Sequence, residues 1–361
     1  MSEKRIGCAV VGYGPVFNWG WMHARWMKAV PEMEVVAICD RNPDCAAKAK
    51  KDFPDIDTHT DLQEMLRRGD IDLVSIVTPH NTHAPLAIEC LKAGKHVCVE
   101  KPMCITIAEA TEMIEAAKRA GKTLAVYHNR RHDGNVRAIK EVIDQGLIGE
   151  VFHIEVTTMG YGGQFSYGRP SDPWRASKAI SGGGLYDWGA HAVDWVLSMV
   201  PSRMAQVTGF FRKLAGGAEA LRAPGQGSSN EEHTRAIIRF ENGCVAEVMQ
   251  SRIAFLGRPY LWYILGTKGA IMDTGRDAIK GYCHELNGPS GGNFKMRTAE
   301  GEKEVPYKES DWATYYADLV NHLLRGAPVP VSGEDGRRVI TVLQTAETSS
   351  KSGKSEEVPF R

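Results

Sequence analysis

The chain lacks a long hydrophobic run and an excess of charge of either sign. No stretch reaches the eighteen or more apolar residues that a membrane-spanning helix needs. No basic segment precedes an apolar one at the N-terminus, as a secretory signal would require. Lys plus Arg and Asp plus Glu number 44 each, so charge gives no basis for binding nucleic acid or an acidic membrane. We therefore expect a cytoplasmic protein with no nucleic-acid and no membrane partner.

The cysteines show no pairing or metal-binding pattern. Eight are scattered over 361 residues, and no Cys-x-x-Cys pair occurs. Cys8, Cys39 and Cys98 lie in apolar runs typical of buried strands, where a free thiol behaves as a small hydrophobe. This usage fits a reducing compartment. The length and the ordinary composition, 43% apolar and 24% charged, predict two globular domains.

The first third of the chain alternates strand and helix signals. Such alternation predicts an α/β fold with a parallel, doubly wound sheet over residues 1–127. The expected strands are 5–11, 34–39, 73–78, 96–99 and 123–127, and the helices are 24–29, 43–51, 61–68, 83–93 and 107–120.

After residue 128 the pattern changes to successive strands with few helices between them. This predicts an α+β domain over 128–361 with an antiparallel sheet. Residues 214–231 and 284–304, rich in Gly, Ala, Ser and Asn, are predicted as loops. The expected strands are 151–159, 206–212, 234–240, 244–252 and 260–266, and the helices are 135–145, 184–199, 311–325 and 336–350.

A glycine turn follows the first strand. Gly12-Tyr13-Gly14-Pro15 would let the backbone turn tightly and approach a pyrophosphate, with the next helix aiming its amides at the charge. Phe17 stands where the third glycine of this fingerprint is usual, and Asn18 or Gly20 could take that part. Alone, the turn is a weak match, and a plain strand-to-helix turn is the alternative.

Asp40 strengthens the prediction of a dinucleotide site. It ends the second strand, where a carboxylate accepts hydrogen bonds from ribose hydroxyls and repels a 2′-phosphate. This favours NAD. Arg41 could pair with that phosphate, which leaves NADP open. The alternative is that Asp40 caps a helix.

The triplet Glu100-Lys101-Pro102 closes another buried strand. Open α/β sheets hold their ligands at this end of the strands, and a lysine beside a nicotinamide could orient or deprotonate an alcohol. The segment from Thr78 to His83 follows a neighbouring strand and should lie over the same crevice. His80 and His83 are spaced for a shared metal, but no third ligand is in view, so we predict no metal site.

A second cluster of polar residues lies in the later half of the chain. If residues 184–199 are helical, Asp187 and His191 share one face. A carboxylate beside an imidazole orients it and raises its basicity, which suits a base that takes a hydroxyl proton. The preceding glycine triplet, 182–184, would let the chain approach a ligand closely. The alternative is a surface helix with a charge pair.

Together these segments resemble the Gfo/Idh/MocA oxidoreductase family. The resemblance implies an N-terminal Rossmann domain over 1–127 and an α+β domain over 128–361 with an open, mainly antiparallel sheet. A second copy is expected to cover that sheet and form a homo-oligomer. The matching segments are Gly12-Tyr13-Gly14, Asp40, Thr78 to His83, Ala93 to Val97 with Glu100-Lys101-Pro102, Asp187-x-x-x-His191, Gly266 to Ala270 and Gly333-Glu334-Asp335.

The resemblance also implies roles for single residues. Lys101, Asp187 and His191 match the catalytic set of the family, and Trp174-Arg175 resembles a motif near the nicotinamide. Arg131 could bind a sugar hydroxyl or a phosphate, or make structural hydrogen bonds. The predicted cofactor contacts are Gly12, Gly14, Pro15, Asp40, Arg41, Thr78, Pro79, Asn81, His83, Glu100, Lys101, Trp174 and Arg175. The predicted substrate contacts are Lys101, Arg131, Trp174, Asp187 and His191.

The predicted function is NAD-dependent oxidation of a secondary ring hydroxyl, at C3, of a sugar or glycoside to a ketone by hydride transfer. The aromatic segment from Tyr161 to Tyr167 favours a glycoside over a small polyol. Three alternatives remain: an NAD-recycling glycosidase or epimerase acting through a transient keto-sugar, an inositol dehydrogenase, and a non-catalytic NAD sensor.

Overall fold

The computed structural model describes residues 5–15, 18–160, 173–213, 228–275, 288 and 291–360. The chain divides into two compact units, residues 1–128 with 313–337 and residues 129–312 with 338–361. Each unit is described by itself, and the domain boundary after residue 127 stays a prediction. Among the described helices, none combines the length and the hydrophobicity that crossing a membrane requires.

The first unit contains sheet A, which is parallel throughout its six described strands, as predicted. The order β3-β2-β1-β4-β5-β6 is that of a doubly wound dinucleotide-binding fold. The strands are β1 (Ile6–Val11), β2 (Met33–Cys39), β3 (Asp57–His59), β4 (Leu73–Ile76), β5 (His96–Glu100) and β6 (Leu124–Tyr127). The helices between them are α1 (Trp19–Lys28), α2 (Pro43–Asp52), α3 (Leu62–Leu66), α4 (His83–Lys92) and α5 (Ile107–Ala120), with the 3-10 turn η1 (His80–Thr82) before α4.

Local sequence signals set the helix ends. Thr106 and Glu109 form a capping box at the start of α5, and Gly121 ends it in the left-handed conformation at φ 60°. At α2, Pro43 takes the first position and the Asn42 side chain accepts a hydrogen bond from the second residue of the helix. These signals explain why the predicted bounds of both helices lie within one residue of the observed ones.

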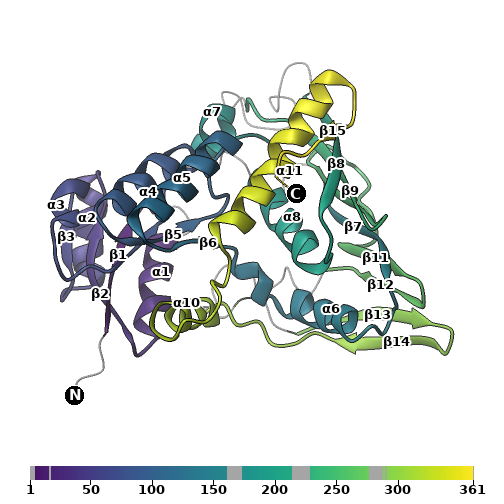
Figure 1. The fold of residues 1–361 in the computed structure, drawn as a ribbon, viewed down its shortest axis with the longest axis horizontal. Helices are drawn as coiled ribbons and strands as arrows, with labels where there is room; N and C mark the ends of the chain where they lie inside the picture. The colour runs from purple at the N-terminus through teal and green to yellow at the C-terminus, as the bar shows by residue number, and fades with distance from the viewer. Residues whose placement is uncertain are drawn as a thin grey trace. The chain divides into compact units, whose positions relative to one another are not determined.

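A late segment of the chain completes the first unit. Helix α10 (Thr314–Arg325) packs here, and its Tyr315 hydroxyl donates to the Val126 carbonyl oxygen at 2.6 Å. Ser332 pairs with Ala125 beside β6. Figure 1 shows α4 and α5 on one face of sheet A, and α1 and α10 on the other. The Rossmann-type unit therefore depends on residues far from it in sequence.

The strand order gathers the predicted site segments of this unit at one edge. Because the strands are parallel, the carboxyl ends of β1, β2, β4 and β5 all meet there. The direction of winding reverses between β1 and β4, and ligands bind in open α/β sheets at such a reversal. Gly12, Asp40, Thr78 and Glu100 therefore line the same edge of sheet A.

The second unit contains sheet B, with nine described strands in the order β14-β13-β12-β11-β7-β10-β9-β8-β15. Strand β10 pairs with β7 in parallel and the other pairs are antiparallel, which confirms the mainly antiparallel sheet. The strands are β7 (Val151–Met159), β8 (Met204–Arg212), β9 (His233–Phe240), β10 (Val245–Ser251), β11 (Trp262–Gly266), β12 (Gly269–Asp273), β13 (Asn293–Thr298), β14 (Gly301–Pro306) and β15 (Glu356–Glu357).

The loop predicted over residues 284–304 is wrong in its second half. Strands β13 and β14 form a hairpin there, in which Phe294 and Met296 point into the core while Lys295 pairs with Glu302 across the strands at 2.9 Å. The glycines before this segment hid a clear alternation of apolar and charged residues. Of the other predicted loop, residues 214–227 lie outside the described part of the chain.

Helices cover one face of sheet B. Most residues of α8 (Trp188–Met199) are buried, and β8 approaches the end of α11 (Gly333–Ser352) so closely that a β-carbon on Gly209 would lie 1.8 Å from the Ala346 carbonyl oxygen. The remaining helical segments of this unit are η2 (Asn129–His132), α6 (Gly134–Asp144), η3 (Pro173–Ala176) and α7 (Lys178–Ser181).

Candidate active site

The three glycines after β1 differ in what surrounds them. Gly12 has φ +102°, and a β-carbon on it would lie 2.1 Å from the Val77 carbonyl oxygen. A β-carbon on Gly20 would lie 2.3 Å from the Gly12 carbonyl oxygen, so Gly20 provides the close packing of helix on turn that the third fingerprint glycine provides. Among the described residues, no atom comes within 4 Å of such a carbon on Gly14, which leaves space there at the turn. Phe17 lies outside the described residues.

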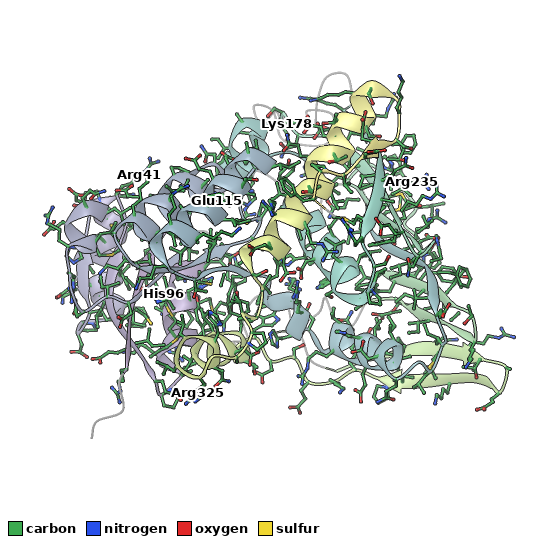
Figure 2. All side chains as sticks on the ribbon, viewed as in Figure 1. Arg41, His96, Glu115, Lys178, Arg235 and Arg325 are labelled. Atoms are coloured by element: carbon green, nitrogen blue, oxygen red, sulfur yellow. The ribbon has the colours of Figure 1, made fainter. Side chains whose placement is uncertain are left out.

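Asp40 is held at the end of β2 by two backbone amides. The amide of Tyr13 donates to Oδ2 at 2.7 Å, and that of Asn42 donates to Oδ1 at 2.9 Å. Each carboxylate oxygen keeps a lone pair for a further donor, such as a ribose hydroxyl. Together with the open space at Gly14, this arrangement fits a dinucleotide. Arg41, labelled in Figure 2, is exposed.

Tyr13 anchors the glycine turn, a role that the sequence analysis missed. Its ring is 2% exposed, and its hydroxyl donates to Asp52 Oδ2 at 2.8 Å on α2. Burial and the Asp52 carboxylate raise the pKa of Tyr13, so the hydroxyl stays a donor. The Lys48 ammonium lies 5.1 Å from the ring centre. The sequence signal for this anchoring role was the presence of an aromatic residue, Tyr13, between two fingerprint glycines.

Glu100 connects the end of β5 to α1. Its Oε1 lies 3.0 Å from His23 Nε2, and its Oε2 accepts a hydrogen bond from the Lys101 backbone amide at 2.9 Å. Burial raises the pKa of Glu100, but the hydrogen bond from His23 and the charges of His23 and Lys101 outweigh it and lower the pKa below its usual value. Glu100 is therefore ionised beside the half-buried Lys101, whose peptide bond to Pro102 is cis.

The segment after β4 is joined to the segment after β5 by a histidine. His83 is fully buried, with Nδ1 2.9 Å from the Pro102 carbonyl oxygen and Nε2 2.8 Å from the Thr78 carbonyl oxygen. Burial lowers the pKa of His83. Pro79 is half-buried and Asn81 exposed on the same segment. The predicted cofactor contacts of these residues stay predictions, and for His83 the burial indicates a role through backbone groups.

In the second unit, α8 begins at Trp188, four residues later than predicted. Gly182 and Gly183 have φ values of +91° and +132°, and residues 184–187 after them form a turn in place of the first turn of the predicted helix. Asp187 therefore stands at the N-cap of the helix, and His191 follows one turn later, buried between aromatic rings. Its ring centre lies 5.7 Å from that of Trp188 and 6.3 Å from that of Trp195.

Arg175 and Trp174 lie beside Asp187. The Arg175 Nη1 donates to Asp187 Oδ2 at 2.8 Å, and its guanidinium stacks 4.5 Å from the centre of the Trp174 ring. Arg175 was predicted only as a cofactor contact, and its ion pair with Asp187 was missed. The two residues are twelve positions apart, in η3 and before α8, so no local periodicity signals the pair.

The glycine triplet is required by the packing of the chain itself. A β-carbon on Gly184 would lie 2.4 Å from the Glu231 carbonyl oxygen, and one on Gly182 would lie 2.6 Å from the Tyr186 ring. This close approach of segments explains Gly182 and Gly184, and the expectation that the triplet approaches a ligand stays a prediction. Lys178 adds ion pairs to Glu231 and to Glu347 next to the triplet.

Two arginines follow β6 and both pair with carboxylates inside the second unit. Arg131 holds Asp194 through two hydrogen bonds of 2.9 and 2.7 Å. Arg130 pairs with the buried Asp133 at 2.8 Å. The Arg130 guanidinium also lies about 5 Å from the ring centres of two tryptophans, Trp188 at 4.8 Å and Trp312 at 5.0 Å. A substrate contact of Arg131 stays a prediction.

Two family profiles match most of the chain. The profile of the oxidoreductase family with an NAD-binding Rossmann fold matches residues 6–128, and that of the Gfo/Idh/MocA C-terminal domain matches residues 136–272. The chain belongs to the Gfo/Idh/MocA family. It is an NAD(P)-dependent oxidoreductase, and the resemblance noted from its motifs is confirmed. Membership sets aside the non-catalytic sensor.

Relatives within the Gfo/Idh/MocA family carry named activities. The scyllo-inositol 2-dehydrogenase (NADP(+)) IolW of Bacillus subtilis is 26% identical over 357 residues, covering 96% of this chain and 94% of that protein. The levoglucosan dehydrogenase of Pseudarthrobacter phenanthrenivorans is 31% identical over 282 residues, covering 72% and 67%. A levoglucosan dehydrogenase solved with NADH and levoglucosan has the same fold, with a TM-score of 0.82 at 22% identity over 99% of this chain and 100% of that one.

Proposed function

We propose that the protein oxidises a secondary ring hydroxyl, at C3, of a sugar or glycoside with NAD, and that Lys101, Asp187 and His191 form its catalytic set. The observation that carries the proposal is the placement of Lys101. It follows β5 directly, at the edge of sheet A where the Gly12 turn and Asp40 also stand. That edge is where an open α/β sheet binds a dinucleotide, so the lysine is available to a reacting group there.

The residues would divide the reaction as follows. NAD, when bound, supplies the oxidant that accepts the carbinol hydrogen with its electron pair. The Lys101 ammonium would donate a hydrogen bond to the reacting oxygen and hold it in place. His191 would take the hydroxyl proton, with Asp187 orienting it, and Lys101 could share that role. Lys101 belongs to the first unit and the other two residues to the second.

Relatives support a cyclic polyol as the substrate class. The names of IolW and of levoglucosan dehydrogenase specify inositol and an anhydrosugar, both of which carry secondary ring hydroxyls. The Trp174 ring is half-buried and stacks on Arg175, the partner of Asp187, and it supports a sugar because aromatic faces stack on sugar rings. A cyclitol is the second candidate, because IolW matches over almost the whole length of both chains. The aromatic segment 161–167 lies outside the described residues.

An NAD-reduction screen tests the substrate class. The panel contains free sugars, inositols, anhydrosugars, and O- and C-glycosides, with the oxidised carbon identified by NMR. We expect NADH formation with a sugar or glycoside and a ketone at C3. Turnover of inositols alone would select the cyclitol candidate. Glycoside cleavage or epimerisation without free NADH would indicate that the dinucleotide is recycled within each turnover. No turnover of any panel member would contradict the proposal.

Lys101→Ala tests the catalytic set. Loss of the group that holds the reacting oxygen should lower kcat about 100-fold or more while leaving the Kd for NAD within about twofold. The matched control is Lys118→Ala, which removes an exposed lysine of α5. Wild-type kcat in Lys101→Ala would refute the assignment. If His191 is the base, the acidic limb of the kcat/KM pH profile should disappear in His191→Gln and persist in the lysine variant.

We also propose that a second copy of the chain covers the open face of sheet B. Phe210 is 53% exposed on β8, and Ile237 on β9, Tyr263 on β11 and Met272 on β12 are only half-buried. Arg235, labelled in Figure 2, is paired with Glu247 on the same face at 2.6 Å. A patch of apolar residues crossed by ion pairs is typical of a subunit interface.

Light scattering tests the oligomer. We expect a mass of at least two chains for the wild-type protein and a lower mass for Phe210→Arg. Leu324→Arg is the matched control, because Leu324 is a similarly exposed apolar residue at the end of α10. A monomeric wild-type protein would contradict the proposal.

A further inference from the structure

Two fully buried histidines lie on either side of the Glu100-Lys101-Pro102 turn. His23 comes from α1, and His83 opens α4. Both have no exposed surface, so neither is available to a ligand by direct contact. A buried histidine costs folding free energy unless its ring nitrogens find partners. Both find them in the residues that flank Lys101.

His23 acts on the N-terminal side of the turn. Its Nε2 lies 3.0 Å from Glu100 Oε1, and because an ionised carboxylate only accepts, Nε2 must carry the proton. The other Glu100 oxygen accepts from the Lys101 amide at 2.9 Å. The Nδ1 of His23 lies 2.6 Å from the Tyr316 hydroxyl, and Ser75 Oγ is 3.2 Å away. These contacts fix the ring and thus the carboxylate.

His83 acts on the C-terminal side. Its Nδ1 lies 2.9 Å from the Pro102 carbonyl oxygen and its Nε2 lies 2.8 Å from that of Thr78. Carbonyl oxygens only accept, and the neutral ring that burial favours carries one proton, so His83 donates to Pro102 when Nδ1 is protonated and to Thr78 in the other tautomer. The Pro102 contact is the one that bears on the lysine. The Thr78 carbonyl oxygen, 2.8 Å from Nε2, belongs to the neighbouring segment at the same edge of sheet A.

We propose that His23 and His83 are positioning residues for Lys101. His23 would act through the Glu100 carboxylate and the Lys101 amide, and His83 through the Pro102 carbonyl. The backbone that carries the lysine is then held from both sides by rigid helices, and its ammonium is presented at one place over the edge of the sheet. The inference rests on the proposed catalytic role of Lys101. Misplacing a reacting or orienting group by about 1 Å can lower turnover about 100-fold.

Substitution by asparagine or glutamine can distinguish the roles of the two ring nitrogens of each histidine. A glutamine places its NH₂ near the position of Nε2, and an asparagine places its NH₂ near that of Nδ1. At position 23 the bond to Glu100 uses Nε2, so His23→Gln should preserve kcat within about threefold and His23→Asn should lower it about 10- to 100-fold. At position 83 the bond to Pro102 uses Nδ1, so His83→Asn should preserve kcat and His83→Gln should lower it.

This reversal is not expected from loss of packing, because the same two substitutions have opposite effects at the two positions. His96→Gln is the matched control: it removes the Nδ1 acceptor of a histidine at the other end of β5, whose hydrogen bond goes to the Thr123 amide. We expect it to lower stability and leave kcat unchanged. The same order of Asn and Gln variants at both positions, or wild-type kcat in all four, would overturn the inference.

A second measurement does not depend on turnover. Reductive methylation with ¹³C-formaldehyde labels lysine amines, and the Lys101 methyl resonance is assigned by its absence in Lys101→Arg. It should shift in His23→Asn and His83→Gln and stay in place in His23→Gln and His83→Asn. If the two disruptive variants do not fold, Glu100→Gln, which keeps the side-chain volume, takes their place. An unshifted resonance there would overturn the inference.

The two proposals fail in different ways. If wild-type protein turns over no panel compound, the proposed function fails, and the lysine resonance alone decides whether the histidines position the side chain. If Lys101→Ala is inactive while the four histidine variants keep wild-type kcat and resonance, the function stands and the positioning role fails.

Discussion

Alanine substitutions at the first two fingerprint glycines, Gly12 and Gly14, should differ in their effects: the first should impair folding and the second cofactor binding. Gly12 has φ +102°, and its β-carbon would overlap the Val77 carbonyl oxygen at 2.1 Å. At Gly14, no atom of the described part of the chain lies within 4 Å of the corresponding position. We therefore expect Gly12→Ala to destabilise the fold whether or not NAD is present. Gly14→Ala should leave the fold intact and weaken the binding of NAD.

The magnitudes follow from these surroundings. At Gly12, the unfavourable backbone conformation costs about 1–3 kcal/mol and the overlap about 1–3 kcal/mol more, so the free energy of unfolding should fall by about 2–6 kcal/mol. At Gly14, a methyl group should change it by less than about 1 kcal/mol. If the open space is filled by the dinucleotide, overpacking of about 1–3 kcal/mol should raise the Kd for NAD about 5- to 150-fold.

Two assays separate these effects. Urea unfolding without NAD, followed by tryptophan fluorescence, gives the stability of each variant, and titration calorimetry gives the Kd for NAD. The reasoning would be refuted if Gly14→Ala bound NAD as tightly as the wild type, because the space at Gly14 would then not be where the dinucleotide approaches. Equal stability of Gly12→Ala and wild type would refute the strain argument.

Two further predictions concern stability. His96 is half-buried and accepts from the Thr123 amide, and burial, with the Lys122 charge, lowers its pKa from 6.5 to about 4. Because the unfolded chain then binds the proton more tightly, about 1–2 kcal/mol of stability present above pH 6.5 should be lost as the pH falls to 4. Urea unfolding against pH should show a smaller loss in His96→Asn. Asp133→Asn removes the carboxylate that neutralises the buried Arg130 guanidinium, which should cost about 3–5 kcal/mol in the same assay, and a loss below 1 kcal/mol would contradict it.

The fold could be predicted where local signals were complete. The capping residue Thr106 and the terminal Gly121 gave the bounds of α5, and the alternating apolar residues gave β7. The hairpin of β13 and β14 was missed because each strand has only six residues and glycines precede the first. The parallel pairing of β7 with β10 joins residues about ninety positions apart, and no local pattern carries it.

The candidate site could be predicted as a set of residues but not as a set of contacts. The motifs identified Asp40, Glu100, Lys101 and His191 from their place after a strand or on a helix. The partners of these residues were missed, because a contact such as His23 with Glu100 joins two segments 77 residues apart. A sequence shows that a histidine is present in an apolar helix, but only the packing shows which carboxylate its nitrogen meets.

The contacts of the motif residues explain why these positions constrain both folding and chemistry. Asp40 accepts from the Tyr13 amide before any ribose is present, Glu100 accepts from the Lys101 amide, and the His83 ring lies between two backbone carbonyl oxygens. Each of them shapes the edge of sheet A through backbone groups of the chain itself. Loss of activity in a variant at these positions therefore does not identify a ligand contact. Only a variant pair that changes the ligand contact at constant stability, such as the one proposed at Gly14 against Gly12, can separate the two roles.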